Sequence, residues 1–349
     1  MIKIDAVNLT NPEKIMVAWH TGYRCNYDCT YCEATRHDNH SRHQTYDSFI
    51  ETFNFVKEYT KIYGHYVNID FTGGEPTVNP AFWDFAEHVI NTEDRFRLSL
   101  TTNGAWHPKN SKRIADIFEG VTVSYHAEAD IKLKSQVLEN IKLLHETGIW
   151  IQVNVMMHVD YFDECTEVCN QLKDLGIMHK PIPIGDGNIE RAGWYLDTDG
   201  TPRRTSHTYT QEQQDWYFKY IGVESPTSNA KEGTDLGRSC CGRRCLKGLV
   251  KNKWQDITYV DTHFKGWYCS VNKYFLYIDQ QKGEVYHHQT CKALHNGKRG
   301  PIGNLKNADA ILQYAIENKD KAIVCPNDRC GCGMCVPKAK DFNDFISLS

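Results

Sequence analysis

The sequence predicts an α/β fold, in which a partial barrel of six parallel strands and intervening helices precedes a small cysteine-rich α+β domain with a β-hairpin. Between residues 15 and 184, short β-rich apolar runs alternate with amphipathic helical stretches, the pattern of repeated βα units. Turn-forming clusters replace this pattern between residues 185 and 239, and most of the 14 cysteines follow from Cys240 onward. We therefore expect a barrel over residues 1–184, a bridging region over 185–239 and a cysteine-rich domain over 240–349.

Six runs rich in β-branched and aromatic residues are the candidate strands. They lie at residues 15–20, 67–71, 96–101, 121–125, 150–156 and 177–184. In barrels of parallel strands, functional groups gather at the C-terminal strand ends, because the βα loops converge there. We therefore expect the chemistry of this chain at residues that directly follow these runs.

Two local signals predict where helices begin. Ser48-Phe-Ile-Glu51 is similar to a capping box at the start of an apolar helical pattern. Asn79 followed by Pro80 supplies an N-cap and a proline at the first helical position, so a helix over 81–90 is expected.

Two glycines predict where later helices end. Gly148 and Gly176 stand where left-handed C-caps would close helices over 133–147 and 162–175. Cys165 and Cys169 lie four residues apart on the second of these helices. Because cysteine is among the most buried residue types, we expect both to pack in the core.

Bulk properties exclude several functional classes. With 349 residues the chain is long enough for two domains. A net charge of -4 gives no electrostatic reason to expect nucleic-acid binding. No apolar run approaches the about 18 residues that span a membrane, and the N-terminus lacks a signal-peptide core. We expect a cytoplasmic protein whose cysteines serve metal binding or catalysis rather than disulfides.

Three cysteines follow the first predicted strand, in Cys25-Asn-Tyr-Asp-Cys29-Thr-Tyr-Cys32. Iron-sulfur clusters are normally held by four thiolates, so three leave one iron open to another ligand. A zinc site is the alternative, completed by His20 or by a histidine of segment 36–43, which contains His37, His40 and His43. That segment is more simply a solvated loop, and its histidines are candidate substrate contacts.

A second motif, Thr72-Gly73-Gly74-Glu75-Pro76, follows the second predicted strand. The two motifs together resemble the signature of the radical S-adenosylmethionine (radical SAM) superfamily. The resemblance implies a 4Fe-4S cluster on Cys25, Cys29 and Cys32, with the amino and carboxylate groups of SAM on the free iron. It also implies that Gly73 and Gly74 receive the amino group of SAM, while Glu75 and Pro76 fix the turn.

The resemblance extends to later strand ends. Thr102 and Asn103, in Thr101-Thr102-Asn103-Gly104, match a frequent ending of the third strand. Ser124 matches a position near the SAM carboxylate or ribose, Asn154 one near the ribose, and Tyr31 one near the adenine. Ordinary strand-end polarity is the alternative for Thr102, Ser124 and Asn154, and screening of the cluster from solvent is the alternative for Tyr31.

The mechanism that the resemblance implies is carried by the cofactor and positioned by the protein. The reduced cluster would pass one electron to SAM, and the resulting 5'-deoxyadenosyl radical would abstract a hydrogen atom from the substrate. The barrel would exclude water and competing hydrogen donors.

The C-terminal cysteines surround a predicted hairpin with strands at 274–278 and 284–287. Their order is similar to the SPASM/twitch extensions of radical SAM enzymes, which hold auxiliary 4Fe-4S clusters. The implied ligands of one such cluster are Cys269, Cys291, Cys332 and Cys335. One departure is that the expected Gly-x4-Cys reads Gly283-x4-His288 here. The remaining cysteines leave open a second cluster or a zinc site: Cys240, Cys241, Cys245, Cys325 and Cys330.

The expected function is that of a radical SAM enzyme with at least one auxiliary cluster. The alternative is a binding or electron-transfer protein that zinc or iron-sulfur only stabilises. The substrate is left open between a peptide or protein and a small molecule or nucleotide, with His126, Glu128 and the Arg243-Arg244 pair as candidate contacts. Expected partners are an electron donor such as flavodoxin or ferredoxin, and a separate peptide-binding partner, because only a short segment precedes the first strand.

Overall fold

The structure is a computed structural model of the whole chain, and it describes most of the barrel continuously. The described residues are 4–9, 14–32, 37–64, 66–184, 209–221, 246–250, 253–256, 264–288, 291, 294–295, 298–326 and 336–348.

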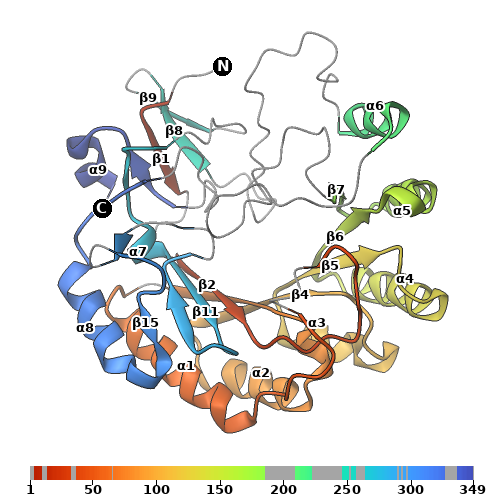
Figure 1. Cartoon of the computed structure of the whole chain (residues 1–349), viewed down its shortest axis with the longest axis horizontal. Helices are drawn as coiled ribbons and strands as arrows, with labels where there is room; N and C mark the ends of the chain where they lie inside the picture. The colour runs from red at the N-terminus through yellow and green to blue at the C-terminus, as the bar shows by residue number, and fades with distance from the viewer. Residues whose placement is uncertain are drawn as a thin grey trace.

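Six parallel strands form a curved sheet, as the sequence predicts (Figure 1). They pair in chain order, and each expected strand is present within one or two residues of its expected bounds. The strands are β2 (Lys14–His20), β3 (Tyr66–Thr72), β4 (Phe96–Thr102), β5 (Gly120–His126), β6 (Trp150–Met157) and β7 (His179–Pro183). The partial α/β barrel is therefore confirmed.

Helices follow each of the first five strands and cover the convex side of the sheet (Figure 1). They are α1 (Tyr46–Lys61), α2 (Pro80–Thr92), α3 (Ser111–Ile117), α4 (Ile131–Glu146) and α5 (Phe162–Asp174). Short 3-10 turns precede several of them, at η1 (Pro76–Val78), η2 (Pro108–Asn110) and η3 (Val159–Tyr161).

The helix boundaries follow local chemistry, with one correction. The expected cap at Ser48 is wrong, because α1 is capped by Thr45, whose hydroxyl accepts from the Ser48 amide at 3.2 Å. The cap at Asn79 is confirmed: its side chain accepts from the Ala81 amide, and Pro80 is the first helical residue. Gly148 and Gly176 have φ of +77° and +69°, the left-handed conformation that favours glycine.

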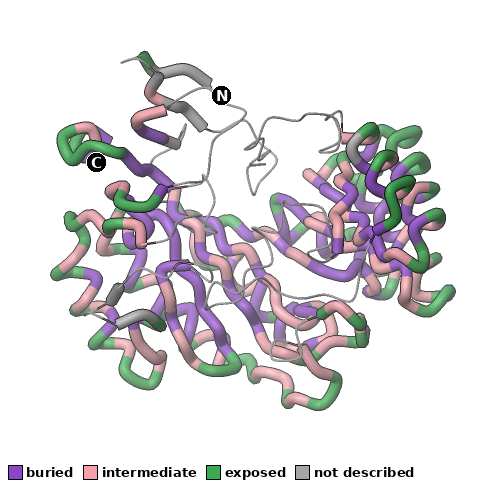
Figure 2. Tube along the Cα trace, turned by 45° about the horizontal axis from the view of Figure 1, so that its top comes forward, coloured by how far each residue is buried: buried purple, intermediate pink, exposed green. Residues whose placement is uncertain are grey.

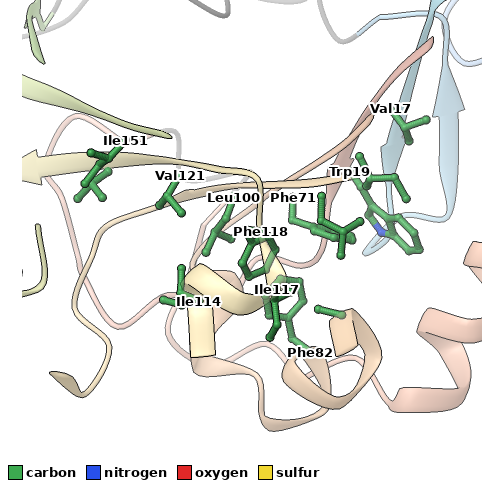
Figure 3. Packing of buried hydrophobic residues seen from close by; sticks show 14 of the residues in the cluster. Val17, Trp19, Phe71, Phe82, Leu100, Ile114, Ile117, Phe118, Val121 and Ile151 are labelled. Atoms are coloured by element: carbon green, nitrogen blue, oxygen red, sulfur yellow. The ribbon is translucent and has the colours of Figure 1, made fainter. Parts of the chain in front are cut away.

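The core lies between the sheet and these helices (Figure 3). Alternate strand residues such as Trp19, Phe71 and Leu100 point toward the helices and are fully buried there. Cys165 and Cys169 are also fully buried in this cluster, which confirms that they are core residues. Figure 2 shows the same arrangement along the trace, with buried strands inside and exposed residues on the outer turns of the helices.

The predicted hairpin exists, and it extends the barrel sheet. β11 (Phe275–Asp279) and β12 (Glu284–Tyr286) pair antiparallel, and β11 lies parallel to β2 with Asp279 opposite His20. β15 (Gly303–Asn304) adds the outermost strand of a nine-stranded sheet, followed by η5 (Leu305–Asn307) and α8 (Ala308–Asn318). The hairpin therefore shares a sheet with the barrel, while the expected domain boundaries stay a prediction.

A second sheet joins the two ends of the described chain. β1 (Ala6–Leu9) pairs with β8 (Leu246–Val250) and with β17 (Lys338–Ala339). The remaining strands are β9 (Lys253–Asp256), β10 (Tyr268–Cys269) and β16 (Ile323–Val324) in this sheet, and the pair β13 (Leu294–His295) and β14 (Lys298–Arg299). Of the expected bridging region, only residues around α6 (Gln211–Tyr220) are described; α7 (Val271–Tyr274) and α9 (Phe342–Leu348) complete the helices. No helix in the described ranges is long and apolar enough to cross a membrane.

Candidate active site

The two motifs meet at the C-terminal edge of the barrel sheet. The cysteine loop leaves β2 and the glycine turn leaves β3, and these strands are neighbours in register from Lys14 to His20. Backbone hydrogen bonds join the two loops: Gly74 N donates to Gly22 O at 2.8 Å, and Glu75 N donates to Arg24 O at 2.9 Å. The turn is therefore part of the support of the cysteine loop.

The loop has a defined backbone course. Cys25 N donates to Asp38 O at 2.7 Å, and Cys32 N donates to Cys29 O at 3.0 Å. The amide of Tyr27 points at Cys25 Sγ from 3.4 Å, a type of contact that tunes iron-sulfur clusters. Cys25 and Cys29 are partly buried, and Cys32 is exposed.

The thiols are hard to ionise without a cation. Burial raises the pKa of Cys25 to about 11, and the carboxylate of Glu75 and the thiol of Cys32 add to the effect. Burial also raises the pKa of Cys29, with a further contribution from Glu128. Metal binding requires thiolates, so a positively charged metal centre would have to supply the free energy for deprotonation.

Glycine is required at both turn positions by the cysteine loop. A Cβ on Gly74 would lie 2.3 Å from Tyr23 O and 2.4 Å from Arg24 O, both backbone atoms. Gly73 has φ of +147°, and a Cβ there would lie 2.7 Å from Gly22 O. Both glycines lie close to the backbone of the cysteine loop. That they also receive the amino group of SAM stays a prediction.

Glu75 joins the glycine turn to the end of β4. Its carboxylate is buried and accepts four hydrogen bonds, from the amide and hydroxyl of Thr77, the hydroxyl of Thr102 and the amide of Asn103. Burial raises the pKa of Glu75, and these donors oppose the rise. Pro76 begins η1 directly after the carboxylate.

Asn103 continues this connection to the cysteines. Its side-chain amide donates to Asn26 Oδ1 at 2.7 Å and lies 3.9 Å from Cys25 Sγ. The turn, the end of β4 and the first cysteine are thus linked through Glu75 and Asn103. The hydroxyl of Thr102 donates to Glu75, so Thr102 has a structural role. Its expected contact with SAM stays a prediction.

His126, at the end of β5, lies against the second cysteine. Its Nδ1 is 3.4 Å from Cys29 Sγ and contacts the hydroxyl of Tyr31, whose ring stacks on the imidazole. Burial lowers the pKa of His126 to about 4, so the ring is neutral near pH 7. The structure therefore places His126 and Tyr31 beside the cysteine loop.

Glu128 holds the same loop from the other side. Its two carboxylate oxygens accept from the amide and the hydroxyl of Thr30, at 3.0 and 2.9 Å. His158 lies 3.7 Å from the same carboxylate. The sequence pointed to His126 and Glu128 as substrate contacts, and the structure shows that both contact the loop itself.

Ser124 and Asn154 lie side by side, as register partners on β5 and β6. Both are partly exposed on the concave face of the sheet. Asn154 Oδ1 accepts from Gln152 Nε2 at 2.9 Å. Their SAM contacts stay a prediction.

The donor set suits a cluster with an open iron. Within the described ranges, no three His, Cys, Asp or Glu side chains lie close enough together to hold a single metal ion. Thiolates of a 4Fe-4S cluster bind different irons, so they need not converge on one point. The alternative is a zinc site in which His37 is the fourth ligand. The contacts of His37 argue against this, because its ring nitrogen lies 3.0 Å from Tyr27 O and 3.6 Å from Asp28. Cys25, Cys29 and Cys32 stay the predicted ligands of such a cluster.

Only part of the expected auxiliary site can be examined. Cys269 is buried, and Cys291 packs against the same small cluster. His288 is buried with its ring 4.2 Å from that of Phe275. Two expected ligands, Cys332 and Cys335, lie outside the described residues. So do the Arg243-Arg244 pair and four of the unassigned cysteines: Cys240, Cys241, Cys245 and Cys330.

The structure also brings residues to the site that the sequence did not single out. Tyr23 donates to Asp279 Oδ2 at 3.0 Å, which joins the C-terminal hairpin to the start of the cysteine loop. Asp70 lies on the concave face of β3 and accepts from Ser99 and Thr101. Asp70 had a signal in the sequence, because Asn68 and Asp70 alternate with the apolar residues of β3.

Comparison with known proteins agrees with this geometry. The family model described as the Radical SAM superfamily matches residues 19–172. GTP 3',8-cyclase of Haemophilus ducreyi is 30% identical over 80 residues, 23% of each chain. The enzyme of the same name from Clostridium perfringens is 24% identical over 178 residues, 47% of this chain and 54% of the relative. The chain thus matches about half or less of these relatives' length.

Solved structures show the same fold. Native anSMEcpe with bound AdoMet and Cp18Cys peptide matches with a TM-score of 0.52 and 15% identity, over 88% of this chain and 81% of that one. Histidine-tagged anSMEcpe with bound AdoMet matches with a TM-score of 0.51 over the same shares. The family model, most of the partial barrel and the two adjoining motifs fall within residues 19–172, and this part of the chain is similar to the Radical SAM superfamily.

Proposed function

We propose that the protein is a radical SAM enzyme whose 4Fe-4S cluster is bound by Cys25, Cys29 and Cys32. The observation that carries the proposal is the junction of the two motifs, in which Glu75 and Asn103 connect the glycine turn to Cys25. A structural metal site has no need of a glycine turn beside it, and the resemblance implies that this turn receives the amino group of SAM. When bound, the cluster and SAM would supply a 5'-deoxyadenosyl radical for hydrogen abstraction.

The chain's own residues would orient and shield this chemistry. Glu75, Glu128 and Asn103 hold the cysteine loop from the ends of three neighbouring strands. Gly73 and Gly74 would offer backbone groups to the amino group of SAM, and Ser124 and Asn154 would contact its carboxylate or ribose. Tyr31 would lie at the adenine or screen the cluster from water. Radical chemistry needs such a dry surrounding.

An auxiliary 4Fe-4S cluster is the second part of the proposal, with Cys269, Cys291, Cys332 and Cys335 as first candidates. The pairing of β10 with β16 supports adding Cys325, which the sequence left unassigned. Cys269 pairs with Ile323, and the pairing continues to Cys325, whose amide donates to Trp267 O at 2.9 Å. Because strand side chains alternate, Cys325 and Cys269 belong to the same face of this ribbon.

The substrate and partners are part of the same proposal. A peptide or protein and a small molecule or nucleotide are both retained, with a flavodoxin or ferredoxin as electron donor and a separate peptide-binding partner for a peptide substrate. GTP 3',8-cyclases match in sequence, and the peptide-bound anSMEcpe matches in fold, but neither resemblance selects one class. A cytoplasmic location is proposed because cysteines that ligate a cluster stay reduced in that compartment.

The test is anaerobic reconstitution with iron and sulfide, followed by dithionite, SAM and an assay for 5'-deoxyadenosine. Wild-type protein should form the nucleoside, and Cys29→Ala should not. Cys169→Ala is the matched control, because Cys169 is buried in the core away from the loop. About eight irons per chain are expected with one auxiliary cluster, falling to about four in Cys269→Ala.

Other outcomes have defined meanings. Zinc in place of iron, or SAM left intact by the wild type, would favour the alternative of a metal-stabilised binding or electron-transfer protein. About four irons in the wild type, unchanged in Cys269→Ala, would remove the auxiliary cluster and leave the SAM chemistry standing.

A further inference from the structure

The concave face of the barrel sheet is polar and partly exposed. On β5, Val121, Val123 and Tyr125 are buried against the helices, whereas Thr122, Ser124 and His126 on the other face are partly exposed. The same alternation holds on β4, where Ser99 and Thr101 are partly exposed. Closed parallel barrels fill their interior with bulky branched side chains. The small polar residues here instead leave a surface that a ligand can contact.

Asp70 is the one carboxylate on this face that the site chemistry does not use, within the part of β2–β7 that the structure describes. It accepts from Ser99 Oγ at 3.1 Å and from Thr101 Oγ1 at 3.4 Å. Register places Ala18 and Ser99 beside it on the two neighbouring strands. Among the described residues, no lysine, arginine or histidine lies within ion-pair distance of this carboxylate.

A carboxylate in this position is costly to keep. Burial raises the pKa of Asp70 from 3.8 to about 6, because two hydroxyl donors replace only part of its lost hydration. At pH 7 the group is still ionised in most molecules. A partly buried carboxylate that has hydroxyl donors but no cationic partner destabilises the fold, so its presence points to a ligand that supplies the opposite charge.

Gln152, on the same face of β6, independently indicates a ligand. The residue is 5% exposed, and its Nε2 donates to Asn154 Oδ1 at 2.9 Å. Its Oε1 is buried and has no hydrogen-bond partner. Because an unsatisfied buried acceptor costs about 1–3 kcal/mol, a donor from outside the protein would offset that cost.

We propose that this concave face binds the part of the substrate that carries a protonated amine or guanidinium group, with Asp70 on β3 as the ion-pair partner of that group, and that Gln152 on β6 accepts from a separate donor of the same ligand. This proposal rests on the proposed radical SAM function and adds a chemical class to its unidentified substrate. The concave face begins at the C-terminal edge of the sheet, where Ser124 and Asn154 lie. A group bound to Asp70 would therefore lie deeper in the barrel than the proposed cluster and SAM. SAM also carries an ammonium group, and the test separates the two sources.

The test measures binding without turnover. The reconstituted protein, saturated with SAM, is titrated calorimetrically with n-butylguanidinium and with n-butylurea, which has the same shape but no charge. The wild type should bind the cation at least tenfold more tightly than the urea. Asp70→Asn should remove this discrimination. Glu58→Gln, which changes an exposed carboxylate on α1, is the matched control and should bind as the wild type does.

Three results would overturn the proposal. The first is that the wild type binds the two probes equally or binds neither. The second is that an Asp70→Asn protein with wild-type iron content still discriminates between the probes. The third is that this variant also loses affinity for SAM, which would assign Asp70 to SAM. The radical SAM function is tested separately by 5'-deoxyadenosine formation in the wild type. Failure of probe binding therefore leaves that function untouched.

Discussion

The backbone amide of Asn103 donates to Glu75 Oε2 at 2.7 Å, which joins the turn after β3 to the end of β4. The side chain of Asn103 then donates to Asn26 within the cysteine loop. Three successive strand ends are therefore connected by one buried carboxylate and one amide. The sequence places these residues in two separate motifs, and the structure makes them a single support for Cys25.

Glu75→Gln is expected to weaken this support. The new amide group would face a donor, because all four hydrogen bonds to Glu75 come from N–H or O–H groups. A buried donor left unsatisfied costs about 1–3 kcal/mol, so the urea midpoint should fall and less iron should be retained. Glu58→Gln on the surface is the control. An unchanged midpoint and iron content would show that Glu75 does not hold the turn.

Glu128→Gln is expected to raise the reduction potential of the cluster. The carboxylate holds Thr30 beside Cys29, and its charge contributes to the raised pKa of the Cys29 thiol. Removing a nearby negative charge favours the reduced, more negative cluster. An electron paramagnetic resonance redox titration measures the shift. Asp130→Asn, at the nearby N-cap of α4, is the control; a potential that does not move, or falls, would contradict the assignment.

Gly74→Ala should disrupt the contact between the two loops. The added methyl would stand 2.3 Å from Tyr23 O, and a backbone atom cannot rotate away. Overpacking of this kind costs about 1–3 kcal/mol, and we expect iron binding to fall with stability. Gly148→Ala is the matched control, since it introduces left-handed strain with no atom within 4 Å. Equal iron retention in the two variants would contradict the steric argument.

Asp70→Asn should stabilise the protein at alkaline pH. The pKa of Asp70 is raised from 3.8 to about 6, so the folded state disfavours the charged form and the penalty is complete above about pH 6. Removing it should add up to about 3 kcal/mol at pH 8, and less as the pH falls toward 4. Ser99, Thr101 and Ala18 surround the group, and none of them titrates. Urea denaturation at pH 8 and pH 5 measures the difference; a gain that grows at pH 5 would refute it.

Gln280→Ala should loosen the hairpin from the barrel. Gln280 Oε1 accepts from the buried indole of Trp19 at 2.6 Å, and its amide group donates to Ser48 O at 3.0 Å. Its loss leaves a buried N–H unsatisfied, at a cost of about 1–3 kcal/mol. The neighbouring Gln281→Ala, whose contact with Gln44 is exposed, should change stability little. Similar urea midpoints for the two variants would mean that the hairpin is not held by Gln280.

Local chemistry explains why much of the barrel could be predicted. β-rich runs and amphipathic stretches alternate regularly from residue 15, and β2 to β7 form where those runs occur. Asn79 and Gly148 act through their own backbone neighbourhood, so their roles could be predicted without tertiary contacts. Ser48 was misjudged because Thr45, three residues earlier, offers an equivalent hydroxyl, and spacing alone did not choose between them.

The sequence by itself determined the cysteine loop, the glycine turn and the strand ends that carry them, because short spacings and strand order fix which residues reach one edge of a parallel sheet. Tertiary structure alone decided what those residues contact. Glu128 and His126 were expected at a substrate and lie against the cysteine loop, and β11 was expected in a separate domain and pairs with β2. Such contacts join residues up to hundreds of positions apart, and they depend on how strands align in space, which no local pattern encodes.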